Sequence, residues 1–207
     1  NNVAPYLGRI NDQGRDGHSE IVAMQKTLEG VNSKCKLLVA SLRNTNELWR
    51  LASEGIQVKT LDIDPLNNPD ILGSATNMPL ENNSFDCVCA FQVLEHMPWE
   101  NSLASICEMK RVAKKNLVLS LPNQLHAWSY SIDLPFLGNI SGFVRNPRSF
   151  PLANKFDGRH YWEVGNRGFS YKEIIKNITY SKFKLLKEFR ITQNTYHHFF
   201  IFETIDH

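Results

Sequence analysis

The sequence lacks several features that would place it in a specialised class. Its four cysteines, Cys35, Cys87, Cys89 and Cys107, form no CxxC pair, which argues against a zinc site. No segment reaches the roughly 18 continuous apolar residues of a membrane span, and no secretory leader is expected. The formal net charge is only +2, so charge gives no reason to expect nucleic acid or an anionic membrane as a partner. We expect a cytoplasmic protein. The first residue, Asn1, is not a methionine, which leaves room for an upstream segment.

Residues 58–98 hold the most informative pattern in the chain. Three short apolar runs, VKTLDI, DILG and FDCVCAF, each end in small or polar residues. Consecutive parallel strands of a nucleotide-binding sheet give this pattern when each delivers a loop to one ligand edge. Asp62 ends the first run, where a carboxylate suits the ribose of an adenine-bearing cofactor.

Strands and helices are expected to alternate along most of the chain. The expected strands are 36–41, 56–63, 70–73, 85–91 and 116–122, and the expected helices are 44–54 and about 99–112. This alternation indicates a parallel sheet with right-handed crossovers. Ser170 and Glu173 form a capping box for a further helix, and the runs 183–191 and 196–205 predict an antiparallel hairpin that closes the sheet edge.

Aromatic residues are spread among proline, glycine and asparagine between Pro122 and Phe169. We interpret residues 1–207 as a single domain, with 123–169 as an insertion or lid within it. As a lid, its rings would enclose a small or sugar-like ligand. As an interface, they would pair with a protein partner or with a second copy of the chain in a homodimer. Both interpretations stay open.

Several motifs give the chain a family resemblance. They are LDIDP after the second expected strand, MPLENNSFDCV leading into the fourth, VLEHMP after it, and EMKRVAKKNLVLSLPN through the next helix and strand. With them, residues 36–122 resemble the class I S-adenosylmethionine-dependent methyltransferases of the branch called type 11. HYWEVGNRGFS and YHHFFIFE are similar to the tail of one subgroup. The resemblance implies a Rossmann-like seven-stranded α/β sheet with parallel strands, a C-terminal antiparallel hairpin and helices on both faces.

The resemblance also implies a cofactor, S-adenosyl-L-methionine, and residues that would hold it. Asp62 would accept hydrogen bonds from the ribose hydroxyls, with Asp64 as an alternative acid. The main chain of Ser74 and Ala75 would face the adenine, and Gln92 would lie near the methionine portion. The full set of cofactor-binding positions is Ser41, Arg43, Asp62, Ile63, Ser74, Ala75 and Gln92.

The chain departs from the family pattern in two places. Ser41, Arg43 and Thr45 stand where the family carries GxGxG, and Ser74 stands where the subgroup often has an aspartate. Glycine is needed in the first place because the backbone turns sharply beside the cofactor. Either Arg43 meets the cofactor's carboxylate in a rebuilt loop, or the pocket has decayed. The expected function is methyl transfer to a small-molecule or glycan acceptor; the alternative is an inactive module that binds a protein partner.

Candidate catalytic residues follow the fourth strand and lie in the insertion. His96 is the first candidate for a general base, because the acceptor is expected to meet the cofactor just past that strand. A helix-entry residue bonded to a nearby backbone group is the structural alternative. His160 and Tyr161 would line the acceptor pocket or pin the lid to the sheet. His197 and His198 should point to opposite faces of the last strand. No metal site is expected from any of them.

Overall fold

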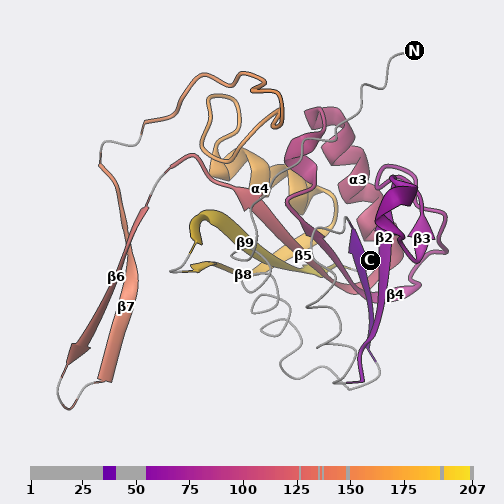
Figure 1. Cartoon of the computed structure of the whole chain (residues 1–207), viewed down its shortest axis with the longest axis horizontal. Helices are drawn as coiled ribbons and strands as arrows, with labels where there is room; N and C mark the ends of the chain where they lie inside the picture. The colour runs from indigo at the N-terminus through magenta and orange to yellow at the C-terminus, as the bar shows by residue number, and fades with distance from the viewer. Residues whose placement is uncertain are drawn as a thin grey trace.

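Seven strands form one sheet, in the order β3-β2-β1-β4-β5-β9-β8 (Figure 1). The computed structural model describes residues 35–40, 55–125, 127–134, 136, 138–147, 150–191 and 194–205. The strands of the sheet are β1 Lys36–Ala40, β2 Gln57–Asp62, β3 Ile71–Leu72, β4 Phe85–Phe91, β5 Ala113–Pro122, β8 Phe183–Ile191 and β9 Asn194–Thr204. The expected helix over 44–54 and the expected cofactor contacts Ser41 and Arg43 lie outside the described residues.

The sheet is parallel from β3 to β5 and antiparallel beyond it. β1 pairs in parallel with both β2 and β4, and β4 pairs in parallel with β5. β9 then runs antiparallel between β5 and β8, so the C-terminal hairpin closes the edge as predicted. Because parallel strands end at one edge of a sheet, the loops after β2, β3 and β4 come together there.

The inner strands bury both faces, which explains their continuous apolar runs. Leu38 and Ala40 of β1 belong to the cluster that packs under two helices, α3 Trp99–Val112 and α4 Tyr171–Tyr180. Leu37 and Val39 point the other way, into a second cluster that includes Cys87 and Cys89. These two cysteines therefore pack as small hydrophobic residues. Each fully buried leucine or phenylalanine contributes about 1.5–3 kcal/mol.

Both described α-helices begin and end where the sequence indicates. α3 starts after Pro98, with Glu100 in its first turn and Lys110 and Arg111 in its last, which complements the helix dipole. α4 begins with a complete capping box: the Ser170 hydroxyl accepts from the backbone N–H of Glu173, and the Glu173 carboxylate accepts from the backbone of Ser170.

The insertion contains a feature that the sequence analysis missed. β6 Ala127–Leu134 and β7 Gly138–Arg145 form a separate antiparallel ribbon that projects away from the main sheet (Figure 1). The signal was present, because Trp128, Tyr130, Ile132 and Leu134 alternate with polar residues at the period of a strand. The sequence analysis predicted no strands over these residues, because their two-residue period was overlooked among the loop-forming residues around it.

Candidate functional site

The candidate site lies where β2, β3 and β4 end. At the end of β2, hydrogen bonds hold the carboxylate of Asp62 in place. Its Oδ1 accepts the backbone N–H of Asp64 at 2.9 Å, and its Oδ2 accepts the amide of Asn67 at 3.0 Å. These bonds hold a side chain that is only 8% exposed in one orientation. Each carboxylate oxygen accepts more than one hydrogen bond, so ribose hydroxyls can be added.

Asp64, the alternative acid, has a different task. Its carboxylate accepts the backbone N–H of Leu66 at 2.9 Å and so caps the short helix η1, Pro65–Asn67. The side chain of Ile63 between the two acids is exposed. The geometry therefore favours Asp62 as the ribose acceptor.

Ser74 and Ala75 form a tight turn directly after β3. The Ser74 hydroxyl shares a hydrogen bond with the hydroxyl of Thr76 at 2.8 Å and accepts its backbone N–H at 3.2 Å. Gly73, just before them, donates its N–H to the carbonyl of Asp62 at 2.9 Å, which ties this turn to the end of β2. A Cβ on Gly73 would lie 2.6 Å from Pro79, so only glycine fits.

Gln92 turns the chain at the end of β4. Its φ of 53° lies in the left-handed region, which is uncommon for a residue with a side chain. Its backbone N–H and its side-chain amide both lie 3.2 Å from the hydroxyl of Ser120 on β5. Gln92 is buried and held on β5, and the next residues are directed into η2, Leu94–His96.

η2 places Glu95 and His96 against the insertion. The Glu95 side chain is fully buried, and its backbone carbonyl accepts the N–H of Tyr161 at 2.8 Å. Nδ1 of His96 lies 3.1 Å from the carbonyl oxygen of Arg159, and the rings of His96 and His160 are 4.9 Å apart. His96 is thus bonded to the backbone, but to the insertion rather than to its own helix.

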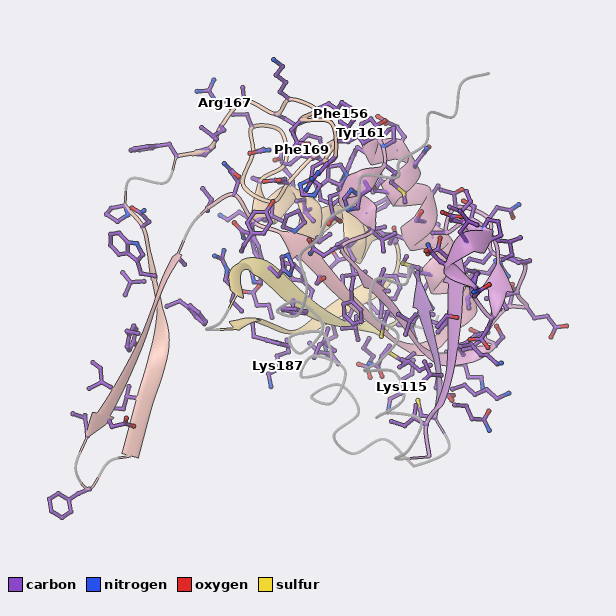
Figure 2. The ribbon with its side chains drawn as sticks, viewed as in Figure 1. Lys115, Phe156, Tyr161, Arg167, Phe169 and Lys187 are labelled. Carbon is purple, nitrogen blue, oxygen red and sulfur yellow. The ribbon has the colours of Figure 1, made fainter. Side chains whose placement is uncertain are left out.

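The tertiary structure brings together all three sequence-predicted catalytic candidates, His96, His160 and Tyr161. The Tyr161 ring packs on Phe156, with ring centroids 4.5 Å apart. Figure 2 shows Phe156, Tyr161 and Phe169 grouped at one end of the molecule, away from Lys115 and Lys187 at the other.

Three polar residues that the sequence analysis did not select support His160. Its Nδ1 lies 2.6 Å from Oε1 of Glu163, which also accepts the hydroxyl of Tyr196 at 2.7 Å. Oδ1 of Asp157 accepts the backbone N–H groups of Arg159 and His160 at 2.8 and 2.7 Å. The spacing of His160 and Glu163 was the available signal; Tyr196 had none, because only the fold brings β9 here.

The carboxylates around His160 change its proton affinity. Burial lowers the pKa of His160, but the hydrogen bond to Glu163 and the charges of Glu95, Glu163 and Asp157 together raise it above its usual value. Burial, followed by the bond to Glu163, raises the pKa of Tyr196, which stays a neutral hydrogen-bond donor.

His197 and His198 on β9 take no part in this cluster. Both are buried, and Nδ1 of His198 lies 3.2 Å from the amide of Asn123. Burial and then the charge of Arg190 lower the pKa of His198 to about 3.

Comparison with known proteins shows the fold. Residues 43–121 match a protein family described as a methyltransferase domain. A methyltransferase of Clostridium acetobutylicum, described as S-adenosylmethionine-dependent, superposes with a TM-score of 0.60 over 94% of this chain and 94% of its own, at 8% identity. The chain has the class I methyltransferase fold. The resemblance seen in the sequence is thereby confirmed, as is the seven-stranded, mostly parallel sheet with its C-terminal antiparallel hairpin.

Two further solved methyltransferases carry bound ligands. The 1,6-didemethyltoxoflavin-N1-methyltransferase of Burkholderia thailandensis, with bound 1,6-didemethyltoxoflavin and S-adenosylhomocysteine, has a TM-score of 0.62 at 10% identity, over 92% of this chain and 80% of its own. The magnesium protoporphyrin IX methyltransferase of Synechocystis, with bound S-adenosylmethionine, has a TM-score of 0.59 at 15% identity, over 95% and 86%.

Among curated sequences, the match is short and of another kind. A probable transaldolase of Chelativorans is 27% identical over 88 residues, which is 42% of this chain and 38% of that protein. The matching part thus spans well under half of that relative's length, and it does not carry a whole-protein activity to this methyltransferase fold.

Within the described residues, the helices are too short or too polar to cross a bilayer.

Proposed function

We propose that this protein transfers a methyl group from S-adenosylmethionine to a small-molecule or glycan acceptor. The observation that carries the proposal is Asp62, a buried carboxylate held at the end of β2 in a methyltransferase fold. An acid at that position accepts the hydroxyls of a ribose. Gln92 at the end of β4 and the turn at Ser74 and Ala75 would flank the rest of the cofactor.

The cofactor supplies an activated methyl group on a positively charged sulfur, and the protein's own residues then have three tasks. Asp62, Ser74 and Gln92 would fix the cofactor, which turns a bimolecular reaction into one between positioned groups. The segment 150–169 would cover the acceptor side and exclude water. We keep residues 1–207 as one domain with 123–169 as an insertion within it. The hydrogen bond from the Tyr161 N–H to the Glu95 carbonyl holds the segment beside η2.

The remaining task is removal of a proton when the acceptor is an alcohol. His96 and His160 lie together past the end of β4, where the acceptor is expected, and either imidazole is a suitable base. The Tyr161–Phe156 ring pair nearby offers an aromatic surface for a ring-shaped or sugar-like acceptor. A small-molecule acceptor is also what the Burkholderia and Synechocystis enzymes are described as using.

The four cysteines at 35, 87, 89 and 107 are free thiols, and a cytoplasmic location stays a prediction. A role for Arg43 at the cofactor's carboxylate stays a prediction, because this residue lies outside the described residues.

The test is calorimetric titration with S-adenosylmethionine and with S-adenosylhomocysteine. We expect micromolar binding, weakened at least tenfold in Asp62→Asn, which keeps the size of the side chain but removes its charge. Asp64→Asn is the matched control and should bind within about twofold of the wild type. Absence of binding at millimolar ligand would overturn the proposal and leave the inactive, partner-binding alternative.

A further inference from the structure

We propose that Glu95, His96 and His160 form a binding site for a divalent transition-metal ion of the Zn²⁺ type. One ligand atom from each of the three residues lies within 4.8 Å of the other two. Two imidazoles and one carboxylate are a ligand set that Zn²⁺ uses with a fourth position open, whereas Mg²⁺ and Ca²⁺ prefer oxygen alone. This proposal goes beyond methyl transfer and does not depend on it.

Hydrogen bonds select the ring nitrogen that each histidine presents. Nδ1 of His96 faces the carbonyl oxygen of Arg159 at 3.1 Å, and a carbonyl oxygen only accepts, so this nitrogen carries the proton. Nδ1 of His160 faces Oε1 of Glu163 at 2.6 Å in the same way. In both neutral rings the lone pair is therefore on Nε2. Imidazoles bound to metals are held in this manner by a carbonyl or carboxylate on their other nitrogen.

Glu95 supplies the negative charge of the site. Its side chain is fully buried, and Oε1 lies 3.9 Å from Nε2 of His96. A buried carboxylate is unfavourable unless positive charge is close by, and a bound cation would provide it. Metal and proton would compete for the Nε2 lone pairs of the two histidines.

A second group of possible ligands, Asp157, His160 and Glu163, shares His160 with the first. Its carboxylates are engaged elsewhere: Asp157 accepts two backbone N–H groups, and Glu163 accepts the Tyr196 hydroxyl as well as the His160 ring. Asp157 and Glu163 therefore orient His160, and we do not expect them to bind the metal ion with it.

A small movement of the three side chains would complete the coordination of a metal ion. Tetrahedral coordination at ~2.0–2.1 Å places ligand atoms about 3.4 Å apart, so each pair of ligand atoms, now within 4.8 Å, would approach by up to about 1.4 Å. Side-chain exposure of 23% at His96 and 16% at His160 gives an ion access from solvent. If the proposed function holds, the fourth position faces the acceptor, and an acceptor hydroxyl bound there would lose its proton more readily.

The test is metal binding without cofactor. The protein, in a Cys107→Ser background that removes the exposed thiol, is freed of metal with a chelator and titrated with Zn²⁺ by calorimetry and with Co²⁺ by visible absorption. We expect one ion per chain with a submicromolar Kd for Zn²⁺, tighter at pH 8 than at pH 6, and a Co²⁺ spectrum typical of tetrahedral coordination.

Substitutions decide whether the ion is at this site. His96→Asn and His160→Asn should each weaken Zn²⁺ binding at least 100-fold, whereas His197→Asn, on β9 outside the cluster, should change it less than threefold. Circular dichroism checks that each variant is folded. Where Glu95→Gln folds, it tests the contribution of the third ligand, the Glu95 carboxylate. Zn²⁺ binding weaker than about 100 μM, or binding retained in both histidine variants, would overturn the proposal. S-adenosylmethionine titrations on the same samples separate this outcome from failure of the proposed function.

Discussion

The indole N–H of Trp162 donates a hydrogen bond to the hydroxyl of Ser102 at 3.0 Å. Ser102 lies on α3, and its hydroxyl in turn donates to the carbonyl of Leu94 at 2.8 Å. The Trp162 ring is fully buried, with its centroid 4.8 Å from that of Trp99 and 5.9 Å from that of Phe169. This bond joins the insertion, α3 and η2 at one point, and it fixes the segment that carries His160 and Tyr161.

Removing the Trp162 anchor should destabilise the whole domain. Trp162→Ala leaves a large cavity, and we expect a loss of about 3–5 kcal/mol in the free energy of unfolding. Trp162→Phe keeps most of the volume but leaves the Ser102 hydroxyl without its donor, for a loss of about 1–2 kcal/mol. Urea unfolding measures both. Phe150→Ala is the control on an exposed ring and should change stability by less than about 0.5 kcal/mol; a Trp162→Ala protein as stable as this control would contradict the anchor.

The hydrogen bond between His160 and Glu163 should make stability decrease as the pH rises above about 6.5. The pKa of His160 is raised in the folded protein, because the carboxylates outweigh burial. Such a group stabilises the fold fully below its unfolded pKa of about 6.5, and the contribution is lost as the pH rises through the folded value. NMR titration of His160 in metal-free protein should show this raised pKa.

Glu163→Gln should bring the pKa of His160 down, because it removes both the charge and the strongest hydrogen bond. Tyr196→Phe leaves the contact of 2.6 Å between His160 and Glu163 in place, so the raised pKa should persist in that variant. An unchanged pKa of His160 in Glu163→Gln would show that another group is responsible.

The buried His198 should lower the free energy of unfolding at acid pH. Burial and the charge of Arg190 lower its pKa to about 3, and the partly exposed carboxylate of Glu188, 3.6 Å away, does not offset them. Because the unfolded chain takes up a proton near pH 6.5 and the folded one does not, stability is lost as the pH falls from 6.5 towards 3.

The measurement is the free energy of unfolding at pH 7.5, 6.5 and 5. We expect the decrease between pH 6.5 and 5 to be smaller in His198→Gln than in the wild type, by up to about 1.4 kcal/mol per pH unit. The variant and the wild type should show parallel behaviour between pH 7.5 and 6.5, where this ring is neutral in both states. Equal acid slopes in the two proteins would count against a buried neutral imidazole.

The ribbon of β6 and β7 should contribute little to the stability of the isolated chain. Phe136 at its tip is fully exposed, and Trp128 and Ile132 on β6 are about half exposed. Phe136→Ser should therefore leave Tm within about 1 °C of the wild type. Phe202→Ala, in the core, should lower the free energy of unfolding by about 3–5 kcal/mol and lower Tm clearly. A lower and concentration-dependent Tm in Phe136→Ser would instead indicate that a second copy covers the ribbon.

The sequence by itself determined the positions of the sheet's strands along the chain, their parallel character and the place of the ligand edge. β4 and α3 fall on their predicted residues, because a continuous apolar run and a 3.6-residue stripe are local signals that read directly as strand and helix. β5 begins at Ala113, three residues earlier than expected from the apolar run alone, since paired backbone extends beyond the buried part of a strand. Asp62 was recognisable because the end of a parallel strand has a defined place in this fold.

Only the tertiary structure decided which side chains meet. His96 and His160 are separated in the chain by α3, β5, β6 and β7, and no periodicity relates them, yet their rings are 4.9 Å apart. Glu163 and Tyr196 gain their roles from the same folding of the insertion onto the sheet, and the ribbon of β6 and β7 is visible as a projecting arm only in three dimensions. Local sequence encodes backbone conformation through steric preference and hydrophobic period. Contacts between distant segments depend on how the core packs, which no single stretch of sequence contains.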